Sequence, residues 1–225
     1  MSSSTLKIIA CIVMLIDHTG ALLFPEILLL RIIGRLAFPI FAFLITEGYS
    51  HTSDKKKYLF RLIAFAFLSE AIFDMALFGE WLAFGYQNIF FTLSIGLAGI
   101  WMYDSFVLNN RLLAYLAFVV SMLAAIYMKT DYSAMGVLTV FVFHLYKNNK
   151  VHLIIGTIIV NSIFPIINII TYKTLNIYTI LQLFAVFSLL IIFNYNGSRG
   201  YRLKYFFYLF YPGHLLVLIL IKNYF

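Results

Sequence analysis

The 225-residue sequence predicts an all-α polytopic membrane protein, and three features of its composition support this prediction. Hydrophobic residues make up 63% of the chain, and the mean hydropathy is +0.96. Charged residues make up 11%, whereas a soluble domain carries about 25%. Because so few polar side chains cannot cover a folded chain in water, lipid must cover most of its surface. This composition excludes an ordinary cytosolic enzyme, a disordered protein and a disulfide-stapled scaffold.

The apolar segments predict a bundle of about nine transmembrane helices. A helix needs about 20 mostly apolar residues to cross a bilayer. By this measure the predicted spans are 5–24, 27–49, 58–78, 88–107, 111–128, 133–147, 151–171, 174–194 and 204–222. Charged or Asn-rich segments separate most of them. No repeat or second domain is visible, so residues 1–225 are predicted to form a single transmembrane domain. The first span is expected to be a retained helix, since no small-residue cleavage site follows it before Arg31.

The basic residues predict the orientation, because cytoplasmic loops carry an excess of Lys and Arg. With the N-terminus inside, eleven basic residues fall on the cytoplasmic side: Lys7, Lys55, Lys56, Lys57, Arg61, Arg111, Lys147, Lys150, Arg199, Arg202 and Lys204. Four fall on the opposite side: Arg31, Lys129, Lys173 and Lys222. We therefore expect a cytoplasmic N-terminus and a C-terminus outside. Topology and contacts with the lipid bilayer account for the net charge of +7, so no nucleic-acid partner is expected.

Ionisable residues inside the predicted spans indicate a buried polar site. Each costs roughly 2.5–3.5 kcal/mol on insertion scales, so it needs a partner or a function. These residues and their polar neighbours are Asp17, His18, Arg35, Glu47, Glu70, Asp74, Asn88, Tyr211 and His214. A structural interpretation stays open, in which Arg35 pairs with Asp17 or Glu70 as a staple between helices. Two histidines at similar depth, beside acids and an arginine, favour a site.

Helix geometry assigns different roles to Asp17 and His18. Neighbouring residues point about 100° apart on a helix, so these two cannot pair with each other on a regular helix. Histidine has a reference pKa of about 6.5, which suits proton transfer near neutral pH. We therefore expect His18 to act as base or nucleophile and Asp17 to anchor Arg35 or backbone. Pro212 lies two residues before His214, and its kink is expected to aim that histidine.

Other polar residues are assigned structural roles, and several absent motifs argue against particular functions. Asn161 and Asn168 share one face of the seventh span and are predicted to hold helices together, as are His144 and Gln182. The sequence has no Gly-rich phosphate loop, so ATP hydrolysis is not indicated. Without His-Glu-x-x-His or Cys-x-x-Cys spacing, no metal is expected. The lone Cys11 cannot form an internal disulfide.

Several motifs, in order along the chain, resemble the TraX family. They are LKIIACIVMLIDHTG, RIIGRLAFPIFAFLITEGYSHT, KKYLFRL, QNIFFTLSIG and KYFFYLFYPGHLLVLILI. The likeness covers nearly the whole chain and is weakest over roughly 100–200. The residues that fall on matching positions are Asp17, His18, Arg35, Glu47, His51, Arg61, Asn88, Tyr211 and His214.

The resemblance implies an integral-membrane acyltransferase of the bacterial cytoplasmic (inner) membrane. Its relatives include the conjugative pilin acetylase and, more distantly, the acyltransferase family 3 enzymes and heparan-α-glucosaminide N-acetyltransferase. It implies acetyl-CoA as the acyl-donor cosubstrate and no metal. The implied acceptor is an amine or hydroxyl of a peptide N-terminus, glycan or lipid that faces outside the cytoplasm. The sequence leaves a homodimer open.

These implications give each candidate residue an expected role. The CoA phosphates are expected near the basic cytoplasmic residues Lys55, Lys56, Lys57, Arg61, Arg199, Arg202 and Lys204. His18 either attacks the thioester or deprotonates the acceptor, and His214 assists, although the sequence does not order the two. The thioester oxygen is expected on Arg35, Asn88 or Tyr211.

The remaining candidates are assigned to the substrate, and two other functions stay open. Glu70 and Asp74 are expected to receive a cationic amine, and Glu47 and His51 are assigned to substrate binding. The first alternative is a proton-coupled transporter, for which buried acids and histidines are equally natural. The second is a purely structural assembly partner, which would tolerate loss of the buried polar residues.

Overall fold

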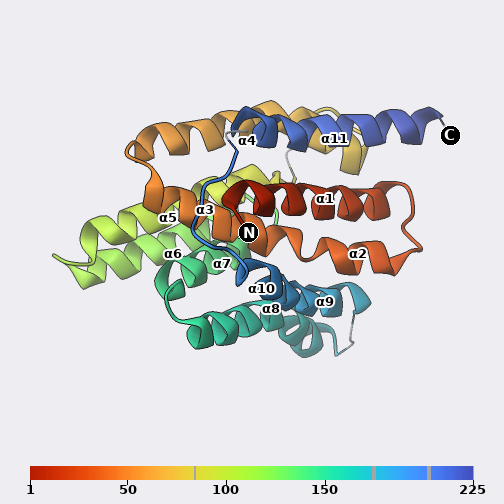
Figure 1. Ribbon diagram of the computed structural model, residues 1–225. Helices are drawn as coiled ribbons and strands as arrows, with labels where there is room; N and C mark the ends of the chain where they lie inside the picture. The colour runs from red at the N-terminus through yellow and green to blue at the C-terminus, as the bar shows by residue number, and fades with distance from the viewer. Residues whose placement is uncertain (84, 174–175, 202–203, 225) are drawn as a thin grey trace.

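The computed structural model describes residues 1–83, 85–173, 176–201 and 204–224, and its regular elements there are helices joined by short connections (Figure 1). The side chains of residues 172, 178 and 204 lie outside this description. The α-helices are α1 (Ser3–Leu22), α2 (Leu28–Gly34), α3 (Ala37–His51), α4 (Lys55–Phe78), α5 (Ile89–Phe106), α6 (Arg111–Tyr127), α7 (Ser133–Tyr146), α8 (Lys150–Tyr172), α9 (Ile177–Leu181), α10 (Ser188–Ile192) and α11 (Lys204–Tyr224). A 3-10 helix, η1 (Gln182–Phe187), joins α9 to α10.

The helices are those of a membrane protein. Within the described residues, five stretches are long and apolar enough to cross a bilayer: α1, α2 together with α3, α5, α8 and α11. Shorter apolar helices occupy Arg111–Tyr127, Ser133–Tyr146 and Thr179–Ile192. Helix α4 has 24 residues, but Arg61, Glu70 and Asp74 interrupt its apolar character. The predicted count of nine spans, and the side of the membrane on which each terminus lies, stay predictions.

The segments predicted to be cytoplasmic gather at one end of the bundle. In Figure 1 the α3–α4 and α5–α6 connections lie on the left, whereas the α1–α2 connection and the C-terminus lie on the right. At the first end, Lys147 Nζ donates to Ser50 Oγ at 3.0 Å. The backbone N–H of Ser3 donates to the Ser198 carbonyl at 2.8 Å. These contacts join segments that the charge pattern assigned to the same face.

The second predicted span is interrupted, and the cause is Pro39. The structure has α2 and α3 in place of a continuous helix over 27–49, with the break at Arg35 and Leu36. A proline ring clashes with the carbonyl four residues earlier and lacks the N–H that would bond to it. Here that carbonyl belongs to Arg35, so the interruption falls where the proline requires it. Arg35 and Leu36 keep right-handed helical dihedral angles, so the interruption lies in the hydrogen-bond pattern directly beside Arg35.

The third predicted span begins earlier than expected. Residues Lys55–Lys57 were predicted to form a loop, but they are the first turn of α4. Asp54 caps this helix, because its Oδ1 accepts from the Lys57 N–H at 2.8 Å. The basic cluster is therefore held on a rigid element at the end of the bundle.

The region 174–194 was also predicted as one span, and its helical part begins at Ile177 and includes η1. Gln182 within η1 is buried, and its Nε2 donates to Asn161 Oδ1 of α8 at 2.8 Å. The prediction that Asn161 and Gln182 hold helices together is confirmed. In Figure 1 this α8–α10 region lies on the opposite side of the molecule from α4 and α11.

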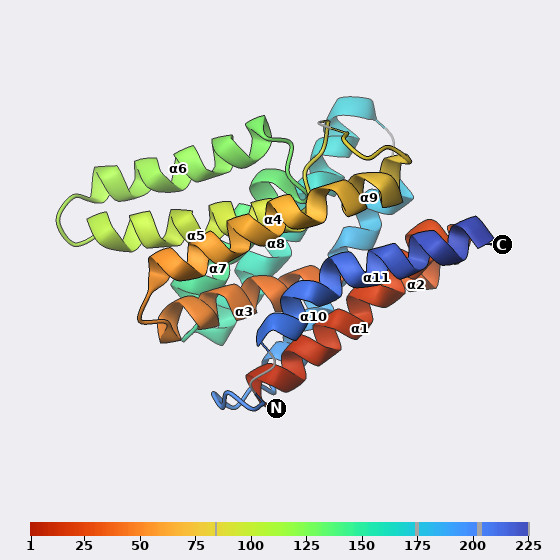
Figure 2. The same cartoon turned by 90° about the horizontal axis from the view of Figure 1, so that it is seen from above.

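Helix α11 completes the part of the bundle that concerns function. It lies alongside α1 and also contacts α4, although more than 100 residues separate it from either (Figure 2). Helix α3 packs against both α1 and α7. These four packing relations bring the first, second, third and last predicted spans around a common space.

Candidate functional site

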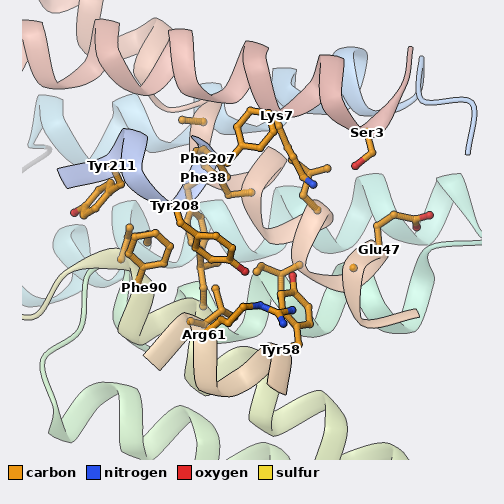
Figure 3. Close-up of a pocket in the computed structure, with 18 of the residues that line it drawn as sticks. Ser3, Lys7, Phe38, Glu47, Tyr58, Arg61, Phe90, Phe207, Tyr208 and Tyr211 are labelled. Carbon is orange, nitrogen blue, oxygen red and sulfur yellow. The ribbon is translucent and has the colours of Figure 1, made fainter. Parts of the chain in front are cut away.

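A cavity of about 890 Å³ lies between α1, α3, α4, α5 and α11. It has a basic end, to which Lys57 and Arg199 contribute, and a second end where Asp17, His18 and Tyr211 line the wall. In Figure 3 Tyr211 and Phe90 lie at one extreme of the view, and Ser3 and Glu47 lie at the other. The cavity thus joins the predicted cytoplasmic end of the bundle to the buried polar residues of its interior.

The two predicted histidines are in direct contact. His18 Nδ1 and His214 Nε2 are 2.7 Å apart, although 196 residues separate them in the chain. On its other side, His214 Nδ1 donates to the carbonyl of Phe210 at 2.7 Å. His18 lines the cavity, whereas His214 is 6% exposed and lies behind it. The imidazole pair therefore presents one ring to the cavity and buries the other.

Asp17 anchors two arginines. Arg35 Nη2 donates to both of its carboxylate oxygens, at 3.0 and 3.1 Å. Arg31 Nη1 lies 2.9 Å from Asp17 Oδ1 and also donates to the Asp17 carbonyl at 2.9 Å. A Cβ atom at Gly34 would collide with the Asp17 side chain, so only glycine allows this approach of α2 to α1. The predicted Asp17–Arg35 contact is present, and Arg35 is not part of the cavity wall among the described residues.

Three predicted site residues form a separate polar cluster instead of lining the cavity. Asn88 is fully buried and caps α5, and its Nδ2 donates to Glu70 Oε2 at 2.5 Å and to the Ala66 carbonyl at 2.7 Å. Asp74 Oδ2 accepts from the N–H of Ala83 at 2.8 Å. Among the described residues, Glu70, Asp74 and Asn88 are absent from the cavity wall. Their contacts join α4 to α5 and to the connection between them.

The basic end of the cavity contains part of the predicted cofactor-binding set. Lys57, Arg61 and Arg199 line it, together with Lys7, which was not assigned this role. In Figure 3 Arg61 lies between the rings of Tyr58 and Tyr208, and Lys7 comes from the facing helix α1. The Arg61 guanidinium is 5.6 Å from the centre of the Tyr58 ring.

The other predicted basic residues do not reach the described cavity wall. Lys55 Nζ donates instead to Tyr49 Oη at 2.9 Å and lies 4.2 Å from the centre of that ring. Lys56 is likewise absent from the wall among the described residues. Arg202 and the side chain of Lys204 lie outside the described residues.

Glu47 and His51 lie at the same end and form a polar trio with Tyr195. His51 Nε2 is 2.6 Å from Glu47 Oε1, and Tyr195 Oη donates to the same oxygen at 3.1 Å. All three residues line the cavity. Burial, reinforced by the charge of Glu47, raises the pKa of Tyr195 to about 12. The Tyr195 hydroxyl therefore stays protonated at neutral pH and remains a donor.

Asp131 is a cavity residue that the sequence analysis missed. It lies in the α6–α7 connection and lines the cavity with its neighbour Tyr132. Tyr86 Oη donates to Asp131 Oδ1 at 2.8 Å. Burial raises the pKa of the Asp131 carboxyl, although this hydrogen bond and the charge of Arg35 act in the opposite direction. Because Asp131 falls between predicted spans, the search for charges within spans passed over it.

The backbone around Asp131 has an unusual conformation that neighbouring contacts hold in place. Tyr132 has φ = 60°, a left-handed conformation that is unusual for a bulky residue. The Tyr132 ring stacks on Phe38 with centroids 4.1 Å apart. The Asp131 N–H donates to the Gln87 carbonyl at 2.8 Å. Strain of this kind persists where surrounding contacts over-determine it, and such positions cluster at functional sites.

Arg31 was also missed, although the sequence contains a signal for it. It lies four residues before Arg35, a spacing that places two side chains on one helix face. Arg31 was not among the candidates because the charge count had assigned it to the outer face of the membrane, at the start of the span 27–49.

Comparison with known proteins covers almost the whole chain. The family profile described as TraX protein matches residues 2–222. The chain is 29% identical over 245 residues to the probable fimbrial assembly protein FimC, serogroup H1, of Dichelobacter nodosus; the match covers 96% of this chain and 94% of that protein. It is 36% identical over 91 residues to the uncharacterized protein RP591 of Rickettsia prowazekii (strain Madrid E), covering 40% of this chain and 33% of that protein. No solved structure matches the chain.

Proposed function

The chain belongs to the TraX family, and from this premise we propose that it is a membrane-embedded acyltransferase. It transfers an acetyl group from cytoplasmic acetyl-CoA to an amine or hydroxyl of an acceptor outside the cytoplasm, in the bacterial inner membrane. The observation that carries this proposal is the cavity that joins a basic mouth to His18. Its volume of about 890 Å³ lies within the range of about 300–1,000 Å³ that ligand cavities occupy. The Dichelobacter relative is named for fimbrial assembly, which favours a fimbrial or pilin subunit as the acceptor.

The basic mouth suits the nucleotide end of acetyl-CoA. Lys7, Lys57, Arg61 and Arg199 line it, and guanidinium and ammonium groups form strong, charge-assisted hydrogen bonds with phosphate oxygens. Beyond the mouth, the wall contains apolar and aromatic side chains such as Phe41 and Leu93. A pantetheine arm is mostly uncharged and fits this environment. The thioester would then reach the ring of His18.

His18 acts as a general base in this proposal, because donor and acceptor meet in the same cavity and need no covalent carrier between them. The acceptor nitrogen or oxygen attacks the thioester carbonyl carbon and loses its proton to His18. The new bond to the carbonyl carbon forms, the carbon–sulfur bond breaks, and the thiolate of CoA takes the proton from His18. Electrons and protons balance without a further reactant.

Tyr211 is the candidate to stabilise the oxygen on which charge develops. Its side chain is 3% exposed and lines the cavity beside His18, with ring centroids 6.2 Å apart. The hydroxyl is buried and donates no hydrogen bond within the described structure. A fixed donor of this kind in a dry site stabilises a developing oxyanion effectively. Asp131, at the same end of the cavity, is the acid available to a cationic acceptor group.

The test is transfer of radiolabelled acetyl from acetyl-CoA by purified protein in nanodiscs, with and without a fimbrial or pilin subunit. His18→Ala should abolish the labelling of the acceptor, whereas the matched control His152→Ala should retain it, since His152 is exposed at the start of α8. Full transfer by a folded His18→Ala protein contradicts the proposal. Absence of transfer combined with proton-driven solute flux into vesicles would support a transporter instead.

A further inference from the structure

We infer that the reacting atom of the histidine pair is His18 Nε2, and that His214 is a positioning residue that fixes the tautomer and orientation of His18. This inference rests on the proposed function for the reaction it serves, whereas the arrangement of the two rings stands by itself. It orders two residues whose roles the sequence left interchangeable.

The contact with the Phe210 carbonyl determines the tautomer of His214. Its Nδ1 is 2.7 Å from the Phe210 carbonyl, and a carbonyl oxygen only accepts hydrogen bonds. His214 Nδ1 therefore carries a hydrogen. In a neutral ring the other nitrogen, Nε2, has none and acts as an acceptor.

The tautomer of His214 in turn determines the tautomer of His18. Its Nδ1 is 2.7 Å from His214 Nε2, so in the neutral pair the hydrogen between them belongs to His18 Nδ1. The remaining nitrogen, His18 Nε2, then has a free lone pair. The Phe210 carbonyl thus determines, through His214, which nitrogen of His18 is basic.

The two rings differ in their access to the cavity. His18 lines the cavity, whereas His214 is 6% exposed and is not part of the cavity wall among the described residues. Both nitrogens of His214 are already engaged, one by Phe210 and one by His18. The Phe210 ring also stacks on His214, with centroids 5.0 Å apart and planes 15° from parallel. His214 therefore has neither a free lone pair nor a route to a substrate.

This arrangement has a consequence for proton transfer. When His18 Nε2 takes the acceptor's proton, the ring becomes a cation with hydrogens on both nitrogens. His214 Nε2 accepts from His18 Nδ1 and stabilises that cation, and the hydrogen between the rings can move to His214 without any change in the net charge of the pair. His214 thus occupies the place that a buried carboxylate has in a Ser-His-Asp triad, but it is neutral before the reaction.

The inference is tested first with diethyl pyrocarbonate, which acylates unprotonated imidazole nitrogens and needs no enzyme activity. Peptide mass spectrometry of the treated wild type should show modified His18 and unmodified His214. His51 is the internal positive control, because its side chain is 68% exposed. Nitrogen-15 NMR of histidine-labelled protein should show His18 with hydrogen on Nδ1. That signature should be lost in His214→Leu, which has no acceptor, and retained in His214→Gln, which offers an amide oxygen.

Kinetics give the second readout. His214→Leu should lower kcat by about 100-fold or more, the scale expected when a general base loses its correct tautomer, with the KM for acetyl-CoA nearly unchanged. His214→Gln should recover most of that loss. Equal loss in both variants would assign proton transfer to His214 itself and overturn the inference. Modification of His214 at the rate of His18, or hydrogen on His18 Nε2, would also overturn it.

The two proposals fail in different ways. A wild-type protein that transfers no acetyl group but shows selective modification of His18, with the expected tautomer, refutes the acyltransferase and leaves the inference intact. A protein that transfers acetyl but fails the modification and NMR tests refutes only the inference.

Discussion

Replacing Asp17 by asparagine tests whether this carboxylate holds the site together. The carboxylate accepts from Arg35 Nη2 at 3.0 and 3.1 Å and lies 2.9 Å from Arg31 Nη1. The side chains of Asp17, Arg35 and Arg31 are 14%, 16% and 23% exposed. Asparagine has nearly the same shape, but it removes the negative charge that pairs directly with the guanidinium groups of Arg31 and Arg35.

The expected loss follows from this burial. Breaking a buried ion pair costs about 3–5 kcal/mol, whereas an exposed pair contributes about 0–1 kcal/mol. The three side chains are mostly but not fully buried, and the amide oxygen of asparagine still accepts one hydrogen bond. We therefore expect Asp17→Asn to lower the free energy of unfolding by about 2–3 kcal/mol.

Reversible unfolding in mixed micelles with increasing denaturing detergent measures this difference. The matched control is Asp54→Asn, which removes a carboxylate at the N-cap of α4, where asparagine caps equally well. It should change stability by less than about 0.5 kcal/mol. In the double variant with Arg35→Gln, the second substitution should cost less than it does alone. An Asp17→Asn protein as stable as the Asp54→Asn control, or strictly additive double variants, would refute the role given to Asp17.

Three further predictions concern the basic mouth of the cavity, Asp131, and the contact between Gln182 of η1 and Asn161 of α8. Lys57→Ala and Arg199→Ala should each raise the KM for acetyl-CoA by about tenfold or more through a lost charge-assisted hydrogen bond. Neither should change the KM for acetyl-pantetheine, which lacks the nucleotide phosphates; equal effects on both donors would place the phosphates elsewhere. Burial raises the pKa of Asp131 in the folded protein, so the unfolded chain releases this proton at a lower pH and stability falls as the pH rises from about 4 to the raised pKa. Asp131→Asn should therefore raise the melting temperature at pH 7, and the gain should disappear as the pH falls below about 4, where the wild-type carboxyl is also neutral; an unchanged or lower melting temperature at pH 7 counts against this. Gln182→Leu should cost about 1–3 kcal/mol of stability by leaving the buried Asn161 oxygen without its donor, and Asn161→Leu in the same chain should cost little more.

The helical class and the positions of most helices were predictable because they depend on local properties. The free energy of transferring a segment into lipid is close to a sum of contributions from its residues. A run of apolar side chains is therefore recognised without knowledge of the segments that pack against it. The polar exceptions in those runs were also informative, and they included both members of the His18–His214 pair. The break before Ala37 was less apparent, since the apolar run 27–49 continues through it.

Which polar residues meet was decided by the tertiary structure. Glu70 and Asp74 are four residues apart and so share one face of α4. The packing of α4 against α5 nevertheless directs Glu70 to Asn88 and away from the cavity. Lys55 and Lys57 are two residues apart, so α4 points them in different directions, and only Lys57 reaches the cavity wall in the described structure.

The helical membrane class, the likeness to the TraX family and the set of histidines, acids and arginines within apolar segments follow from the sequence alone. Only the packing of the helices places His18 on the cavity wall with His214 behind it, and brings Asp131 to the same cavity from the α6–α7 connection. The reason is physical. Hydropathy and helical spacing are encoded over a few turns of chain, whereas the rotation of a helix about its axis is set by packing against distant segments, as where His18 of α1 meets His214 of α11, 196 residues away. A rotation of one residue on α1 would exchange the surroundings of Asp17 and His18, and no local pattern records which of the two faces the cavity.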